Sequence, residues 1–220
     1  MTCLLVAATS FEISPFIESY RNSTNQFPGK HELDILITGI GLTASTYSTT
    51  KQINLKRPDL VIQAGIAGCF DRNVPLASVF IVRQDRIADL GVVEKNEFRS
   101  LFDSGLIPAN HYPYTNGWLV NKSEALKKTK LKKVKAISVN EISTQKRRIK
   151  FFEESFDPVL ESMEGAALHH VCLMEKIEFV QLRSVSNYVG ERNKKNWKFE
   201  ASINTLNVEL ADLLKISGVL

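Results

Sequence analysis

Short apolar runs recur along the chain, and small or polar residues follow each of them. The runs span residues 3–8, 33–38, 59–64, 78–82, 134–139 and 178–185. A continuous apolar run bounded by turn residues is typical of a strand that is buried on both faces. The pattern therefore predicts six strands of a sheet that is covered on both sides.

Helical stretches alternate with these runs, at residues 43–56, 165–176 and 195–216. The first stretch ends at Arg57, because the Pro58 that follows disfavours a continuing helix. Alternating strands and helices predict an α/β fold with a parallel or mixed sheet. Ligands bind such sheets at the carboxyl ends of the strands, where we expect glycine-bearing loops at 39–41 and 65–68.

The composition fits one globular domain. The chain has 220 residues, of which 44% are hydrophobic, and this is enough for one sizeable core. Residues 89–117 are expected to form an inserted loop region rather than a second domain. We therefore expect a single domain that spans residues 1–220.

The net charge is small, but the charged residues are unevenly distributed. The formal net charge is +4, yet residues 121–150 hold eleven basic residues and only two acidic ones. No aromatic side chain lies in 122–149 to stack on nucleic-acid bases. We interpret this basic stretch as a solvated surface and expect no nucleic-acid partner. A non-catalytic nucleic-acid-binding protein is the remote alternative.

Cysteine usage and the N-terminal apolar run indicate a cytoplasmic protein. Cys3, Cys69 and Cys172 are widely spaced and lie in apolar stretches, as reduced core thiols do. The N-terminal run has no basic leader, and Glu12 interrupts it too early for a signal peptide or a membrane span. We therefore expect no membrane contact.

No metal or nucleotide cofactor is expected. Gly39 and Gly41 follow a predicted strand, but Ala44 stands where a dinucleotide fingerprint has its third glycine. The histidines lack metal-ligand spacing, and adjacent histidines on a helix point to different faces. They are His31, His111, His169 and His170.

Candidate chemistry lies where predicted strands end. Glu12 follows the first strand and is either a general base or a first-turn glutamate that complements a helix dipole. Glu164 lies at a strand-to-helix junction, followed by small residues. The polar segment 183–187 ends an apolar strand, and buried polar groups require a partner or a ligand. Trp197 is either a partly buried helix anchor or a ligand contact. Arg192 is either a solvated side chain or a ligand contact.

Five motifs follow one another along the chain: Glu12, Gly-Ile-Gly at 39–41, Ala-Gly-Ile-Ala-Gly at 64–68, Ser-Met-Glu-Gly-Ala-Ala at 162–167 and Arg-Ser-Val-Ser-Asn at 183–187. In this order they resemble the superfamily of nucleoside phosphorylases and methylthioadenosine/adenosylhomocysteine nucleosidases, over nearly the whole chain. Within it, segments 88–91, 100–106 and 189–197 are most similar to futalosine hydrolases. The resemblance implies a three-layer domain in which helices surround a mixed, twisted sheet that is partly closed into a barrel.

The resemblance also implies hydrolysis of an N-glycosidic bond, with release of hypoxanthine from futalosine in an alternative route to menaquinone. Glu12 would activate the attacking water and Glu164 would bind the ribose hydroxyls, while Met163 would pack on the sugar. Glu12, Glu164 and Asn187 form the implied catalytic set. The implied substrate-binding set is Gly41, Ala64, Gly65, Ile142, Ser143, Ser162, Met163, Arg183, Arg192 and Trp197.

Asn187 departs from the adenine-specific members of this superfamily, which carry an aspartate at the same place. The amide oxygen can accept a hydrogen bond and the NH₂ can donate one to a carbonyl, which is the pattern that a 6-oxopurine requires. An ionised aspartate would repel that carbonyl. The sequence therefore predicts hypoxanthine as the leaving base, with a water needed to protonate N7.

Water fits this site better than phosphate, because the segment after the first strand carries Glu12 and no cation before Arg21. Arg183 is the exception, so a purine nucleoside phosphorylase stays open as an alternative, as does a methylthioadenosine/adenosylhomocysteine-type nucleosidase. Arg192 and segment 89–103 are candidates to hold the benzoate tail of futalosine. Family members assemble so that a neighbour completes the pocket, which implies a homo-oligomer, a dimer or larger.

Overall fold

The computed structural model describes residues 1–24, 33–95 and 97–220. The strands are β1 (Cys3–Ala7), β2 (Leu33–Ile37), β3 (Leu60–Cys69), β4 (Val79–Asp85), β5 (Gly91–Glu94), β6 (Glu97–Ser100), β7 (Tyr114–Thr115), β8 (Trp118–Val120), β9 (Lys133–Ser138), β10 (Leu160–Ser162) and β11 (Glu178–Tyr188). The helices are α1 (Ser10–Thr24), α2 (Leu42–Lys56), α3 (Lys146–Phe156), α4 (Gly165–Glu175) and α5 (Phe199–Ser217), with short 3₁₀ helices η1 (Glu124–Lys127) and η2 (Lys194–Asn196).

Five strands close into a barrel. The main sheet runs in the order β2-β1-β3-β10-β9-β4-β8-β7, and β11 pairs with both β3 and β4. The strands β3, β10, β9, β4 and β11 therefore form a closed ring of mixed parallel and antiparallel pairs. This closure confirms the expected mixed α/β sheet, partly closed into a barrel. β1 and β2 extend the sheet in parallel from β3.

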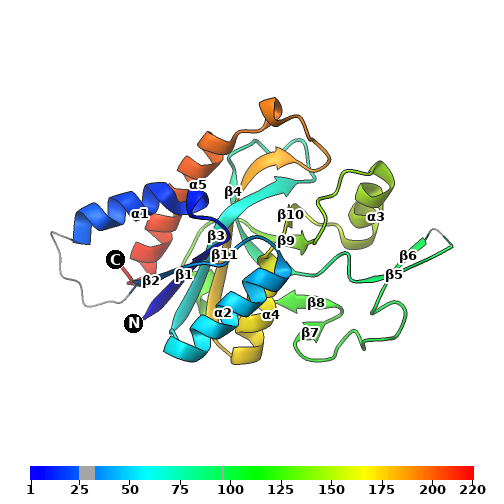
Figure 1. Ribbon diagram of the computed structural model, residues 1–220, viewed down its shortest axis with the longest axis horizontal. Coiled ribbons are helices and arrows are strands. Elements are labelled where there is room, and N and C mark those ends of the chain that lie inside the picture. Colours follow the sequence, from blue (N-terminus) through cyan, green and yellow to red (C-terminus); the bar gives the residue numbers. More distant parts are fainter. Residues whose placement is uncertain (25–32, 96) are drawn as a thin grey trace.

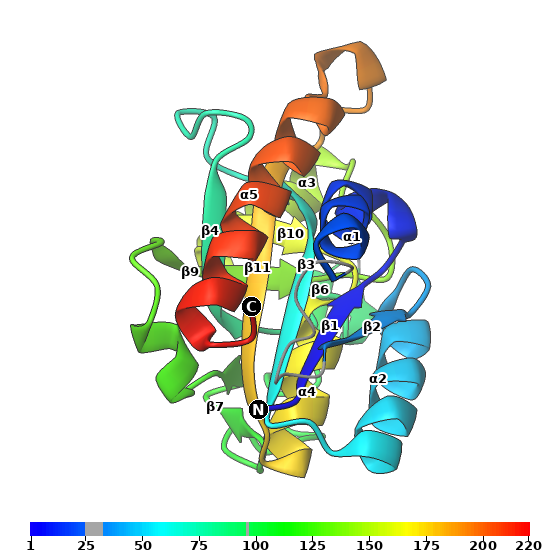
Figure 2. The same ribbon diagram turned by 90° about the vertical axis from the view of Figure 1, so that its left-hand side faces the viewer.

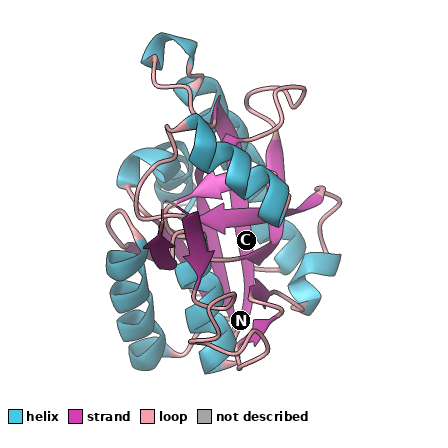
Figure 3. Cartoon of the chain, turned by 90° about the vertical axis from the view of Figure 1, so that its right-hand side faces the viewer, coloured by secondary structure: helices cyan, strands magenta, loops and turns pink. Residues whose placement is uncertain are grey.

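Helices cover the barrel and its extension on several sides (Figures 1 and 3). Helices α1 and α5 lie together, and Figure 2 shows α5 lying along β11. Their apolar residues Ile13 and Leu206 pack in one core cluster with Leu5 and Ile62 of the strands. Helices α2 and α4 pack against each other on another side of the sheet. Burial of these apolar faces, rather than helix propensity, stabilises the arrangement.

The apolar runs identify the strands well. Each of the six predicted strands is present, as β1, β2, β3, β4, β9 and β11, and the helices predicted at 43–56 and 165–176 are α2 and α4. Helix α2 ends as expected before Pro58. Arg57 there adopts a left-handed backbone (φ 40°), and its N–H donates to the carbonyl of Ile53 at 2.7 Å.

The predicted loop at 65–68 is wrong, because these residues continue strand β3. They pair in parallel with β11, from Gly65 beside Arg183 to Gly68 beside Asn187. Glycines inside a strand often mark places where another group approaches the backbone closely. Here the small residues make room for side chains of the neighbouring strands instead of forming a turn.

Two other segments differ from the prediction. The last helix begins at Phe199 rather than at 195, because residues 194–196 form a 3₁₀ turn and Trp197 has an extended backbone. Segment 89–117 contains the β5–β6 hairpin and β7 in addition to loops. Helix α3 begins within the basic stretch and extends beyond it, and Phe152 and Phe156, which follow that stretch, provide its buried face.

The Cys3, Cys69 and Cys172 thiols are buried and unpaired. In the described ranges, no helix has both the length and the apolar character needed to cross a membrane.

Candidate active site

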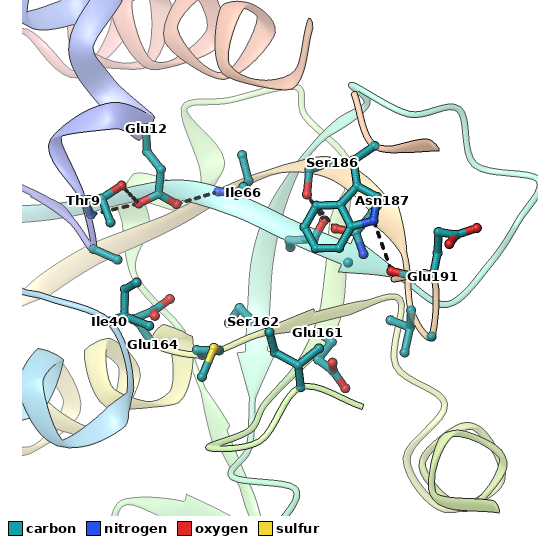
Figure 4. A pocket seen from close by; sticks show the side chains of 18 residues that line it. Thr9, Glu12, Ile40, Ile66, Glu161, Ser162, Glu164, Ser186, Asn187 and Glu191 are labelled. Carbon is teal, nitrogen blue, oxygen red and sulfur yellow. Dashed lines mark hydrogen bonds between the residues drawn. The ribbon is translucent and has the colours of Figure 1, made fainter. Parts of the chain in front are cut away.

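A cavity of about 300 Å³ lies where the ends of β1, β2 and β11 meet the second half of β3 and the β10–α4 turn. Figure 4 shows Glu12 and Glu164 at one end, with Ser186, Asn187 and Glu161 nearer the other. The residues of the predicted set that line it are Glu12, Ile142, Ser162, Met163, Glu164, Asn187 and Trp197.

Glu12 is fixed by backbone N–H groups from two elements. Thr9 precedes α1, and its N–H donates to Glu12 Oε2 at 3.0 Å, in the manner of a capping box. The N–H of Ile66 in β3 donates to Oε1 at 3.1 Å. Burial raises the pKa of Glu12 above the ordinary value, and the Arg183 charge and these hydrogen bonds partly offset the rise. Glu12 is therefore both a helix cap and a buried carboxylate that faces the cavity.

Arg183 lies behind the acidic end of the cavity. Its side chain is almost fully buried, and its Nη1 lies 3.7 Å from Glu164 Oε2. Nη2 donates to Gln63 Oε1 at 2.8 Å, and Nη1 donates to the carbonyl of Ile66 at 3.4 Å. The other Glu164 oxygen, Oε1, accepts the N–H of Gly41 at 3.0 Å. The guanidinium therefore compensates two buried carboxylates without lining the cavity itself.

Two glycines make this arrangement possible. A Cβ on Gly65 would lie 2.3 Å from Arg183 Nη1 and 2.9 Å from Glu12 Oε1, so no side chain fits there. Gly41 adopts a positive φ of 95°, which L-residues avoid, and this conformation directs its N–H to Glu164. Neither glycine lines the cavity, but both position the groups that do.

Asn187 brings an amide to the other end of the cavity. Its Oδ1 accepts the hydroxyl of Ser186 at 2.8 Å, and its Nδ2 donates to the carbonyl of Tyr188 at 3.0 Å. An amide oxygen has a second lone pair and an NH₂ group a second hydrogen. Asn187 therefore keeps one acceptor and one donor position for a ligand.

The other predicted binding residues lie around the cavity rather than in its wall. Ala64 is fully buried in β3, and Ser143 is buried while its N–H donates to Glu161 Oε1 at 3.0 Å. Arg192 is exposed, and its guanidinium lies 5.6 Å from the centre of the Trp197 ring. Trp197 does line the cavity, and its indole N–H donates to the carbonyl of Glu191 at 3.1 Å.

Sequence reasoning missed several lining residues. Ser186 directly precedes the predicted Asn187, and Thr9 lies three residues before Glu12; their polar side chains beside a strand end were the available signal. Glu161 directly precedes the predicted Ser162 at the strand-to-helix junction, and that position was its signal, although its strand β10 has only three residues. The missed lining residues with side chains labelled in Figure 4 are Thr9, Ile40, Ile66, Glu161, Ser186 and Glu191.

Among the described residues, no group of three or more His, Cys, Asp or Glu side chains is placed to hold a metal ion, and His31 lies outside those residues. In the basic stretch, Lys127, Lys135, Arg148 and Lys150 pair with carboxylates.

Residues 4–217 match the family model of the phosphorylase superfamily, so the chain belongs to that superfamily.

Its relatives include two kinds of nucleosidase. The chain is 30% identical to the 5′-methylthioadenosine/S-adenosylhomocysteine nucleosidase of Haemophilus ducreyi over 162 residues, 70% of this chain and 67% of the relative. It is 26% identical to the futalosine hydrolase of Streptomyces coelicolor over 189 residues, 83% of this chain and 79% of the relative. The native structure of futalosine hydrolase from Helicobacter pylori has the same fold, with a TM-score of 0.78, 20% identity and coverage of 98% of this chain and 97% of that one.

Gly65→Ala is expected to disturb the acidic end of the cavity. The added Cβ must displace the Arg183 guanidinium or the Glu12 carboxylate, and small misplacements of reacting groups lower rates by about 100-fold. Measurement of kcat/KM on a purine nucleoside tests this. Gly105→Ala is the control for a glycine replacement away from the cavity. Unlike Gly65, Gly105 has a positive φ, so the replacement strains its backbone, but nothing lies within 4 Å of its Cβ position. Equal activity of the two variants would contradict the role given to Gly65.

Proposed function

We propose that this protein hydrolyses the N-glycosidic bond of a purine nucleoside. The observation that carries the proposal is the opposition of two buried carboxylates, Glu12 and Glu164, at one end of a cavity and the Asn187 amide at the other. A nucleoside has a sugar that becomes positively charged as the bond breaks and a base that becomes negatively charged. Carboxylates at one end and hydrogen-bonding groups at the other complement these two charges.

The reaction follows from the positions of these groups. Glu12 accepts a proton from water while the water oxygen forms a bond to the anomeric carbon of the ribose. The bond from that carbon to the purine nitrogen breaks, and its electron pair leaves with the base. The base takes up a proton from a second water, and the hydroxide so formed takes the proton from Glu12, so the net reaction consumes one water. Glu164 accepts hydrogen bonds from the ribose hydroxyls. The raised pKa of Glu12 makes it a stronger base than an exposed glutamate.

Charge in the cavity wall supports water over phosphate as the attacking group. Four glutamates line the cavity, and no lining residue within the described ranges has a cationic side chain. Arg183, the cation that left phosphorolysis open, is buried behind the wall and occupied by Glu164, Gln63 and the Ile66 carbonyl. A phosphate dianion requires several cationic or N–H donors.

The proposed base is a 6-oxopurine, as in futalosine. Support comes from Asn187, whose free donor and acceptor positions match the carbonyl oxygen and protonated N7 of hypoxanthine. Most of the curated relatives compared are named 5′-methylthioadenosine/S-adenosylhomocysteine nucleosidase, and this observation favours that activity as the second candidate. The two candidates share the hydrolytic step and differ in the base and in the group on the 5′ carbon of the ribose.

Release of hypoxanthine from futalosine in buffer with and without phosphate tests the hydrolysis. We expect the same rate in both, and a strict phosphate requirement would overturn the proposal.

Glu12→Gln is expected to lower kcat by about 100-fold to 10,000-fold, because general bases contribute rate factors of this order. In the wild type, kcat/KM should fall as the pH drops through a pKa above the ordinary 4.5, since Glu12 must be ionised to accept a proton.

Asn187→Asp is expected to shift the preference from futalosine toward its 6-amino analogue by about tenfold to 100-fold, because a buried polar mismatch has this effect. The readout is the ratio of the two kcat/KM values. Asn193→Asp is the matched control, because Asn193 is exposed and its side chain caps η2, a role that aspartate also fills. An unchanged ratio in Asn187→Asp would show that Asn187 does not determine which base the enzyme prefers.

We also propose that the protein is a homo-oligomer. Ile40 lines the cavity yet is 63% exposed, and Tyr47 on the nearby helix α2 is 67% exposed. Exposed apolar side chains beside a site are typical of an interface. The mass in solution, measured by light scattering, should be two or more times the 24.7 kDa of one chain. Replacing Tyr47 by Lys should lower this mass. A wild-type protein that stays monomeric at assay concentration would disprove this.

A further inference from the structure

The start of helix α4 is held by side chains of neighbouring strands rather than by the residue that begins the helix. Glu164 is the N-cap of α4, yet its side chain makes no capping hydrogen bond. The first N–H groups of a helix have no partner within the helix and require acceptors from outside it. The N–H of Gly165 donates to Ser162 Oγ at 3.3 Å. The N–H of Ala166 donates to Ser138 Oγ at 2.8 Å, so the Glu164 carboxylate is left for the cavity.

Ser138 connects α4 to a buried carboxylate, Asp85 of β4. The Ser138 hydroxyl donates to Asp85 Oδ1 at 3.0 Å, and its oxygen lies 3.3 Å from Ser162 Oγ. Asp85 and Ser138 are both fully buried. A hydroxyl has one hydrogen to donate, so Ser162 is the donor in the contact between the two serines. The carboxylate therefore fixes the direction of every hydrogen bond from the start of α4 inward.

Gly165 lets this carboxylate lie directly against the helix backbone. A Cβ on Gly165 would lie 2.2 Å from Asp85 Oδ2 and 2.1 Å from Nε2 of Gln181, which is also fully buried. The N-terminus of a helix carries a partial positive charge that a nearby carboxylate stabilises. Asp85 and Gln181 therefore fill the space beside the first residue of α4 and fix how closely the helix approaches the barrel.

Asp85 also adds a negative charge to the surroundings of Arg183. Burial raises the pKa of Asp85 to about 6, and the Ser138 hydrogen bond and the Arg183 charge partly offset this rise. The carboxylate is therefore mostly ionised at pH 7 and above. Arg183 Nη1 also lies 3.7 Å from Glu164 Oε2. The guanidinium thus interacts with a carboxylate in the barrel interior and with one in the cavity wall.

We propose that Asp85 and Ser138 are positioning residues that hold the start of α4 and thereby set the place of the Glu164 carboxylate in the cavity. Neither of them lines the cavity, so they act through the helix. In the proposed function, on which this assignment rests, Glu164 binds the ribose hydroxyls. A displaced α4 start therefore weakens recognition of those hydroxyls more than it weakens the rest of the reaction.

Hydrolysis of futalosine and of its 2′-deoxy analogue tests this role, because the analogue lacks a hydroxyl that Glu164 binds. Ser138→Ala removes the acceptor of the Ala166 N–H, and we expect the ratio of the two kcat/KM values to narrow by about tenfold, as for loss of a buried hydrogen-bond partner. Asp85→Asn should narrow the ratio less, since the amide oxygen still accepts from Ser138 but carries no charge. Ser123→Ala is the matched control and should leave the ratio unchanged. Ser123 is buried and accepts the N–H of Phe179 at 3.1 Å, but it does not line the cavity.

A double variant separates positioning from a general loss of stability. In a Glu164→Gln background, Ser138→Ala should change the ratio little, because the group that Ser138 positions is already altered. An unchanged ratio in Ser138→Ala, or additive effects in the double variant, would overturn the proposal. Asp85→Asn in the same background gives this readout if Ser138→Ala is unstable.

Hydrogen exchange at the start of α4 provides a measurement that does not depend on turnover. The amide of Ala166 should exchange faster in Ser138→Ala than in the wild type or in Ser123→Ala, because its acceptor is lost. Equal exchange in the three proteins would also overturn the proposal. The proposed function fails separately, when the wild type releases no hypoxanthine from futalosine while the difference in exchange is present.

Discussion

The buried guanidinium of Arg183 holds the acidic end of the cavity together. Without it, Glu12 and Glu164 would be two buried carboxylates with no cation beside them to compensate their charge. The charge of Arg183 offsets part of the rise that burial causes in the pKa of Glu12, and Arg183 Nη1 lies 3.7 Å from Glu164 Oε2. A buried ion is stable only when its partners compensate the lost hydration, and Gln63 and the Ile66 carbonyl complete that compensation.

This arrangement constrains the barrel around it. Arg183 is on β11 and reaches across β3 at Gly65, where any Cβ would collide with it. The pairing of β11 with both β3 and β4 closes the ring and brings Arg183 behind the cavity. The same closure pairs Gly68 with Glu161 on one side and with Asn187 on the other, at the other end of the cavity. Strand glycines thus lie at both the carboxylate end and the amide end of the cavity.

Two features of the site show where sequence reasoning works and where it stops. Glu12 had two interpretations, and the structure gives it a helix-capping contact as well as a place in the cavity wall. These interpretations are compatible, because Glu12 Oε2 accepts the N–H of Thr9 while Oε1 accepts the N–H of Ile66. Residues 65–68 have the composition of a loop, but pairing with β11 keeps them extended. Long-range pairing overrides local preference there.

The sequence by itself determined the order of strands and helices, the mixed α/β class and the motifs at strand ends, because apolar periodicity and glycine placement are local signals. Only the tertiary structure decided that Arg183 lies behind the cavity, that Arg192 is exposed and that Glu161 shares a row with Asn187. Those facts depend on barrel closure, which pairs residues more than a hundred positions apart in the chain. Burial and charge compensation arise from such pairings, so no local pattern contains them.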